Sequence, residues 1–251
     1  MEKYFDINEA GCSVRCKLYA DDPRAVRHAV IYGHGFSGHK DTRAAEKFAR
    51  YALSKYKGVG VLCFDLPCHG EDARKKLRLS DCDAYIDLVC RHAREALGAQ
   101  TLSLYATSFG AYLQLRHIAL FGSPYRRLVL RSPAVNMIDA LTTTIMGEAE
   151  LEKLRRGKEV LVGFDRKIRI GADFLEELRQ QDIRSWEFYD YADDILILHG
   201  TKDEIISFDA VRDFADQNVI AFLPVENADH RFQDPRLLEK ANIRAAAFME
   251  L

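Results

Sequence analysis

The sequence predicts an α/β fold, a mostly parallel sheet with helices on both faces. Short, continuously apolar segments alternate with segments whose apolar residues recur at helical spacing. Strands that are apolar throughout are typical of a sheet covered on both faces. With 251 residues and 48% hydrophobic content, the chain can bury the core of one large domain.

The chain begins with a predicted antiparallel hairpin. Its strands, residues 3–7 and 13–19, flank the turn sequence Asn8-Glu-Ala-Gly11. Strands and helices then alternate, as crossover connections between parallel strands require. The predicted strands are residues 28–32, 58–64, 101–105, 128–130, 195–198 and 219–223, and the clearest predicted helices are residues 42–56 and 81–97 and the one that ends near Leu120.

One connection is longer than the others. About sixty residues separate the strand that ends near Arg131 from the strand that begins at Ile195, far more than one crossover helix needs. We expect a helix over residues 137–156, a hairpin of residues 159–163 and 167–170, and an amphipathic helix over residues 174–181. Ligands bind at the carboxyl edge of such sheets. We therefore expect residues 137–191 to form a small cap over that edge, and residues 1–136 and 192–251 to form the core.

Composition restricts the partners. A net charge of -2 does not indicate a nucleic acid or an anionic membrane as a partner. The six cysteines form no C-x-x-C pair, and no apolar stretch resembles a signal peptide or a membrane span. We expect a cytoplasmic protein with a small-molecule partner and no metal; the sequence leaves a homodimer open.

The first candidate for chemistry is Ser108. In Ala106-Thr107-Ser108-Phe109-Gly110, an apolar segment ends at the serine and a helical pattern follows at once. A strand–turn–helix arrangement exposes a serine hydroxyl at the edge of the sheet, where it can attack an acyl carbon. Such a serine can also serve only as a helix N-cap. Because Ala106 replaces the first glycine of the G-x-S-x-G pattern, the remaining sequence must decide between these roles.

Two further candidates follow later strands. Asp203 comes after the predicted strand 195–198, where an acid can orient an imidazole, although a turn aspartate can also only cap the turn; Glu204 is the second choice of acid. His230 lies in a loop after the last strand, where a general base can approach Ser108, although a lone loop histidine is often only solvated. The order Ser, Asp, His, each after a strand, favours catalysis.

The loop after the first parallel strand contains Gly33-His34-Gly35-Phe36. Glycines allow the backbone to turn sharply and to approach a ligand closely. We expect the main-chain N–H groups of Phe36 and Phe109 to form an oxyanion hole. A glycine-rich turn without a catalytic role is the alternative interpretation.

Together these features resemble the motifs of α/β-hydrolase-fold serine hydrolases, and the resemblance runs from His28 to the terminal helix. The chain is particularly similar to small bacterial esterases related to cinnamoyl (feruloyl) esterases, which carry a compact helical and β-hairpin insertion after strand six. This resemblance implies Ser108 as nucleophile, His230 as base and Asp203 as its orienting acid. The motifs that carry it are His34-Gly35-Phe36, Asp65-Leu-Pro-Cys-His69-Gly70, Ala106-Thr-Ser108-Phe-Gly110, His199-Gly-Thr-Lys-Asp203 and Asn227-Ala-Asp-His230.

We therefore expect a carboxylesterase-like serine hydrolase that cleaves small to medium acyl or aryl-acyl esters through an acyl-enzyme, without any cofactor. The same residues could serve a peptidase, a thioesterase, an acyltransferase or a slow ligand-binding protein. Aromatic residues of the cap could line the substrate pocket, although each could also pack in the core. The expected pocket residues are His34, Gly35, Phe164, Phe174 and Trp186.

Overall fold

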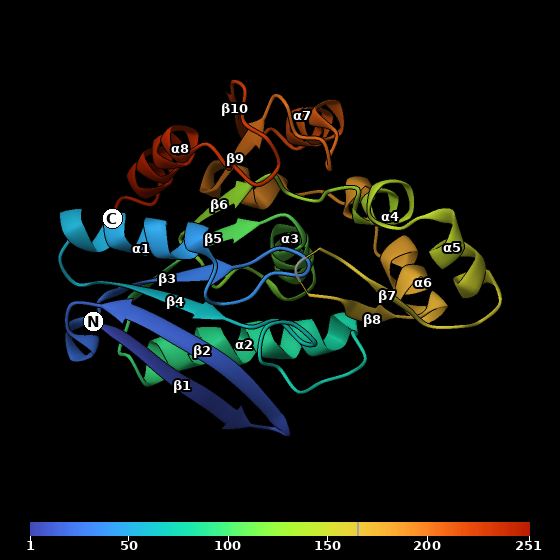
Figure 1. Cartoon of the computed structure of the whole chain (residues 1–251). Helices are drawn as coiled ribbons and strands as arrows, with labels where there is room; N and C mark the ends of the chain where they lie inside the picture. Colours follow the sequence, from blue (N-terminus) through green and yellow to red (C-terminus); the bar gives the residue numbers. More distant parts are fainter. Residues whose placement is uncertain (165) are drawn as a thin grey trace.

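A single large sheet runs through the molecule (Figure 1). The computed structural model describes residues 1–164 and 166–251, and in this part of the chain the sheet has eight strands in the order β1-β2-β4-β3-β5-β6-β9-β10. β1 (Glu2–Glu9) and β2 (Cys12–Ala20) form the predicted antiparallel hairpin. β2 is also antiparallel to β4, and the remaining neighbours are parallel. The predicted, mostly parallel sheet is confirmed.

The parallel strands end at one edge of the sheet, and this common edge positions the site. In β4 every residue is buried, as the continuously apolar pattern predicted. Register pairs Gly33 of β3 with Ala106 of β5, and Thr107 of β5 with Arg131 of β6. The parallel strands are β3 (His28–Gly33), β4 (Val59–Phe64), β5 (Thr101–Thr107), β6 (Arg127–Arg131), β9 (Ile195–Gly200) and β10 (Ala221–Val225).

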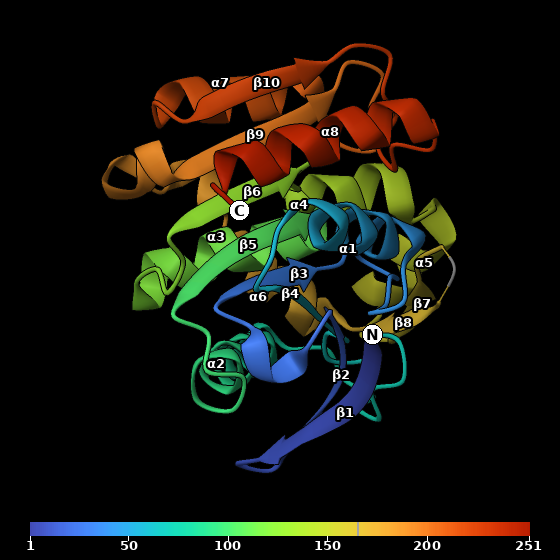
Figure 2. The same ribbon diagram turned by 90° about the vertical axis from the view of Figure 1, so that its left-hand side faces the viewer.

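Helices cover both faces of the sheet (Figures 1 and 2). α1 (Arg43–Lys55) and α8 (Pro235–Phe248) lie side by side over one face, and α2 (Leu79–Glu95) and α3 (Phe109–Phe121) cover the other. α7 (Phe208–Gln217) packs against β9 and β10. Among the residues described, no helix is both long and apolar enough to cross a membrane.

The connection between β6 and β9, which we call the β6–β9 segment, extends from the carboxyl edge of the sheet (Figure 1). β7 and β8 pair antiparallel, as predicted for this hairpin, and Asp165 of its expected turn lies outside the described residues. The elements of the segment are α4 (Met137–Asp139), a π-helical turn η2 (Ala140–Ile145), α5 (Glu148–Arg155), β7 (Val160–Val162), β8 (Ile168–Ile170), α6 (Ala172–Gln180), η3 (Ile183–Ser185) and η4 (Tyr189–Asp194).

The expectation of one continuous helix over residues 137–156 is wrong. The hydroxyls of Thr142 and Thr143 donate to main-chain carbonyls one turn earlier, at 2.9 and 2.8 Å, within the π-helical turn. Met146 then adopts an extended conformation, and α5 begins after Gly147. Hydroxyl groups that bond to the preceding turn compete with regular helix geometry, and wider turns of this kind interrupt a helix.

Candidate active site

Ser108 occupies a strained turn between β5 and α3. Its φ is 52° and its ψ is -121°, a conformation that non-glycine residues rarely adopt. Its main-chain N–H donates to the carbonyl of Arg131 at 3.1 Å, and its own carbonyl accepts the N–H of Ala134 at 3.2 Å. The Ser108 side chain makes no capping hydrogen bond to α3, so its hydroxyl is not used as a helix cap.

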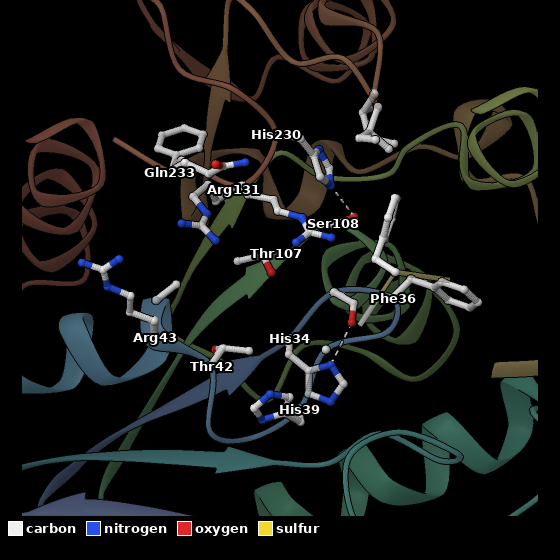
Figure 3. A pocket seen from close by; sticks show the side chains of 18 of the residues that line it. His34, Phe36, His39, Thr42, Arg43, Thr107, Ser108, Arg131, His230 and Gln233 are labelled. Atoms are coloured by element: carbon white, nitrogen blue, oxygen red, sulfur yellow. Dashed lines mark hydrogen bonds between the residues drawn. The ribbon is translucent and has the colours of Figure 1, made fainter. Parts of the chain in front are cut away.

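The three predicted residues form one hydrogen-bonded chain. Nε2 of His230 lies 3.0 Å from Oγ of Ser108, a contact drawn in Figure 3. Nδ1 of His230 lies 2.8 Å from Oδ2 and 3.0 Å from Oδ1 of Asp203. Asp203 lies in the loop after β9 and His230 in the loop after β10. The common edge of the sheet thus brings together side chains that are 122 and 27 positions apart along the chain.

Asp203 is held from several directions. Its side chain is 0% exposed, and Oδ1 accepts the main-chain N–H groups of Ile205 at 2.9 Å and Ile206 at 2.8 Å. Burial alone would raise the pKa of Asp203, but the hydrogen bond and charge of His230 and the N–H of Ile206 hold this pKa below its usual value. Asp203 therefore braces its own turn and also presents a carboxylate to the imidazole.

Glu204, the second choice of acid, contacts His230 differently. Its Oε2 accepts the main-chain N–H of His230 at 3.2 Å, so it holds the loop and not the imidazole. His199, to which the sequence assigned no role, is a further neighbour of Asp203: its Nε2 lies 3.5 Å from Oδ2 of Asp203. Burial lowers the pKa of His199, and this ring stays neutral against the carboxylate.

The loop after β3 contacts the start of α3 closely. A Cβ atom on Gly35 would lie 3.1 Å from Cβ of Ser108, and one on Gly110 would lie 2.4 Å from the carbonyl oxygen of His34. The rings of Phe36 and Phe109 pack edge to face, with centroids 5.6 Å apart. Within residues 1–164 and 166–251, no acceptor pairs with the main-chain N–H of either phenylalanine. Two donors are therefore free beside Ser108.

Ala106, which replaces the first glycine of the usual elbow pattern, fits without strain. It lies inside β5, is 0% exposed and does not have a positive φ. Its register partner on β3 is Gly33, where an added Cβ would lie 3.3 Å from Cβ of Ala106. Gly33 on β3, which has no side chain, leaves room for the Cβ of Ala106 on β5.

A second motif, Asp65 to Gly70, ties two loops together. The buried carboxylate of Asp65 accepts the main-chain N–H groups of Lys40 at 2.6 Å and Glu71 at 2.8 Å. Nε2 of His34 accepts the N–H of Leu66 at 3.1 Å. These bonds fix the loop after β3 to the loop after β4, and this loop after β3 carries Gly35 and Phe36. The described residues contain no cluster of His, Cys, Asp or Glu that could hold a metal ion.

A sequence profile of the family described as "Alpha/beta hydrolase family" matches residues 30–241. The chain belongs to the alpha/beta hydrolase family. This membership supports hydrolase activity, and it agrees with the fold that the sequence predicted. No curated protein matches the chain by sequence.

Solved structures share the fold of this hydrolase along nearly the whole chain. Est1E from Butyrivibrio proteoclasticus with bound ferulic acid is 18% identical, with a TM-score of 0.77, and the match covers 98% of this chain and 100% of Est1E. A putative hydrolase from Agrobacterium vitis is 17% identical (TM-score 0.79; 99% and 98% covered). The esterase domain of a Rhodothermus marinus protein is 18% identical (TM-score 0.67; 100% and 98% covered). The predicted resemblance to feruloyl-esterase-like proteins is thus confirmed for the fold.

A cavity of about 500 Å³ opens beside Ser108 and His230 in this hydrolase. Three of the five expected pocket residues line it: His34, Gly35 and Phe164. The ring of Phe164 comes from the β6–β9 segment, and its main-chain N–H donates to Oγ of Ser37 at 3.0 Å. A volume of this size is typical of sites for small organic ligands.

Phe174 and Trp186 do not line the cavity. Phe174 is 1% exposed, and its ring packs edge to face on that of Phe109 with centroids 6.4 Å apart. It lies on the buried face of the amphipathic helix α6, with Leu175 and Leu178. Trp186 packs, partly buried, against the same core. Sequence reasoning could not separate core aromatics from cavity aromatics, because both kinds follow the same apolar periodicity.

Arg131 lines the cavity although the sequence analysis gave it no role. Arg131 ends β6 directly beside Thr107, and Figure 3 shows its side chain among those that line the cavity. It is 5% exposed, and its side chain carries a guanidinium group. The only signal in the sequence was a charged residue at the end of an apolar strand.

Proposed function

We propose that this hydrolase cleaves carboxylic esters of small to medium acyl or aryl-acyl groups, with Ser108 as nucleophile, His230 as base and Asp203 as the acid that orients His230. The observation that carries the proposal is the hydrogen-bonded chain from Oγ of Ser108 through His230 to Asp203, which begins at a serine in a strained turn.

The first half of the reaction forms an acyl-enzyme. His230 takes the proton of Ser108 as the hydroxyl oxygen attacks the ester carbonyl. The carbonyl oxygen becomes negatively charged, and the main-chain N–H groups of Phe36 and Phe109 donate to it. Asp203 stabilises the imidazolium that forms. The C–O bond to the alcohol then breaks, and the alcohol leaves with the proton from His230.

The second half releases the acid. A water molecule gives a proton to His230 and attacks the acyl carbon, and the same two N–H groups stabilise the new oxyanion. When the bond to Ser108 breaks, His230 returns the proton to the serine oxygen. No step requires a cofactor.

In this proposal, residues 137–191 act as a cap over a core of residues 1–136 and 192–251. Support comes from the lining of the cavity, to which the β6–β9 segment contributes Phe164, Met137, Ala140 and Ile145. These apolar groups suit an alkyl or aryl portion of an ester. The ferulic acid bound to Est1E is an aromatic acid of the kind such a cavity would accept.

The test compares hydrolysis of short-chain 4-nitrophenyl esters by the native protein and by Ser108→Ala. We expect the variant to lose at least about 10³-fold in kcat/KM, because the nucleophile is absent. Ser54→Ala is the matched control, since Ser54 lies at the surface end of α1 and donates to a main-chain carbonyl at 2.8 Å. A fluorophosphonate should label Ser108. Equal rates for native protein and Ser108→Ala, or labelling elsewhere, would refute the proposal.

A further inference from the structure

Arg131 is a buried cation that forms no ion pair with the described residues. Its side chain lines the cavity that also contains Ser108 and His230. Its Nε and Nη1 atoms are buried and have no hydrogen-bond acceptor, and no carboxylate of the described residues forms an ion pair with it. A buried charge and buried N–H groups without partners are both unfavourable, so an arrangement of this kind needs a reason.

Arg127, a second arginine on the same strand, can be compared with Arg131. Arg127 lies four residues earlier in β6, on the same face of the sheet. Each guanidinium lies over a phenylalanine ring, 5.4 Å from its centroid for Arg127 and 5.1 Å for Arg131. Arg127 also pairs with the carboxylate of Asp194 at 2.5 Å. Both arginines therefore lie over a ring, and among the described residues only Arg127 also has a carboxylate partner.

The rest of the cavity has the same sign of charge. Its lining includes the cationic side chains of Arg43 and Lys47. Among the described residues that line it, Asp41 is the sole carboxylate, and two lysine ammonium groups outside the lining lie 3.0 and 3.2 Å from its oxygens. Among the described lining residues, cationic side chains thus outnumber the one carboxylate, and this balance favours a negatively charged ligand.

Resting on the ester hydrolysis proposed above, we propose that Arg131 binds a carboxylate of the substrate, so that the preferred substrates are monoesters of dicarboxylic acids. A guanidinium presents two parallel N–H groups to the two oxygens of a carboxylate. A single buried guanidinium balances a single negative charge, which is the charge of a carboxylate.

The backbone places this anion site close to the reacting atoms. Thr107 is the register partner of Arg131, and the N–H of Ser108 donates to the Arg131 carbonyl at 3.1 Å. Since Ser108 and Arg131 also line one cavity of about 500 Å³, a substrate whose acyl carbon bonds to Ser108 can extend within it to Arg131. The carboxylate lies on the acyl side, and it stays bound to Arg131 while the acyl-enzyme exists.

The experiment compares two esters of equal chain length, mono(4-nitrophenyl) adipate and 4-nitrophenyl hexanoate. The measured quantity is the ratio of their kcat/KM values, anionic over neutral. We expect Arg131→Gln to lower this ratio by about 10- to 100-fold, because the charged hydrogen bonds to the carboxylate are lost. Arg131→Lys keeps the charge without the paired N–H groups and should give an intermediate ratio. Arg127→Gln, the matched control on the same strand and face, should leave the ratio within about twofold of the native value.

An unchanged ratio in Arg131→Gln would overturn the inference, even where both rates fall together, since an equal fall indicates a structural role. A second measurement needs neither a variant nor turnover: calorimetric titration of the native protein with adipate, and with 1,6-hexanediol as the uncharged control. We expect binding of adipate alone, and absence of adipate binding would also overturn the inference. If adipate binds but neither ester is hydrolysed in a Ser108-dependent way, the ester hydrolase proposal fails and the anion site stands.

Discussion

At the scale of single residues, two neighbouring acids have different tasks, and the sequence analysis placed Asp203 ahead of Glu204 for contact with the imidazole. Asp203 contacts the imidazole of His230 through both carboxylate oxygens, whereas Glu204 contacts only the main-chain N–H of the same residue. The difference follows from the turn after β9, in which Asp203 accepts two main-chain N–H groups and is thereby directed inward.

The two acids can be separated by amide substitutions that keep their shape. We expect Asp203→Asn to lower kcat for short-chain esters by about 10³- to 10⁴-fold, because the imidazole then loses the carboxylate that orients it and stabilises its charged form. Glu204→Gln retains an acceptor for the N–H of His230 and should cost less than about tenfold. Steady-state kinetics on both variants is the measurement, and a larger loss in Glu204→Gln would reverse the assignment.

At the scale of elements, the site depends on close contact between α3 and the loop after β3. Alanine is favoured over glycine by about 1 kcal/mol in helices generally, yet Gly110 lies in the first turn of α3 against the backbone of His34. The contact is backbone against backbone and no side chain can move aside.

Because of this contact, we expect Gly110→Ala to destabilise the protein, although helix propensity alone would favour alanine. We expect the free energy of unfolding to fall by about 1–3 kcal/mol, since the added Cβ would lie 2.4 Å from a carbonyl oxygen. Urea unfolding is the measurement. Gly147→Ala is the control, because Gly147 has φ -89° and its added Cβ would meet only the end of the Glu150 side chain. A more stable Gly110→Ala protein would contradict the expected contact.

A second element-scale contact joins the β7–β8 hairpin to the site. Ser37 is 1% exposed, and its hydroxyl accepts the N–H of Phe164, the residue whose ring lines the cavity. We expect Ser37→Ala to raise KM for aryl esters by about 3- to 10-fold and to lower kcat less, because one hydrogen bond that places Phe164 is lost. Ser185→Ala removes an exposed hydroxyl of the same β6–β9 segment and should behave as the native protein. Equal KM values for both variants would show that the bond does not place Phe164.

At the scale of the whole molecule, buried histidines couple folding to pH. Burial lowers the pKa of His34 to about 4 and that of His69 to about 3, from an ordinary value near 6.5. Between these values the unfolded chain binds more protons than the folded protein. The free energy of unfolding therefore rises with pH from about 4 to about 6.5 and falls on acidification.

We expect the free energy of unfolding to be lower at pH 5 than at pH 7 by about 2–4 kcal/mol. Urea unfolding at both pH values tests this, and equal stabilities would contradict it. His69→Asn provides the internal comparison, because the amide can replace the donor that bonds the Pro67 carbonyl at 2.8 Å without a titrating ring. The difference between the two pH values should shrink by about half in this variant.

The fold and the Ser–His–Asp chain could be predicted because their signals are local and ordered. Each of the three residues follows a strand, and parallel strands bring their carboxyl ends to one edge. Arg131 could not be predicted, because its role depends on the register of β6 with β5 and on the lack of an acid beside it among the described residues. The different environments of Phe174 and Phe164 could not be predicted either, because only the packing of α6 and of the hairpin decides which ring is buried.

The hydrogen bond between the Ser108 N–H and the Arg131 carbonyl has a consequence for substrate length. This bond fixes the backbone of Ser108, directly after β5, to the end of β6, and so holds the starting points of the two side chains in a constant relation. A diacid too short cannot reach from the serine oxygen to the guanidinium, and one too long must fold back on itself. In a homologous series of dicarboxylic monoesters, kcat/KM should therefore pass through a maximum, and Arg131→Gln should abolish it. The separation between the serine oxygen and the guanidinium would then determine which acids the enzyme releases.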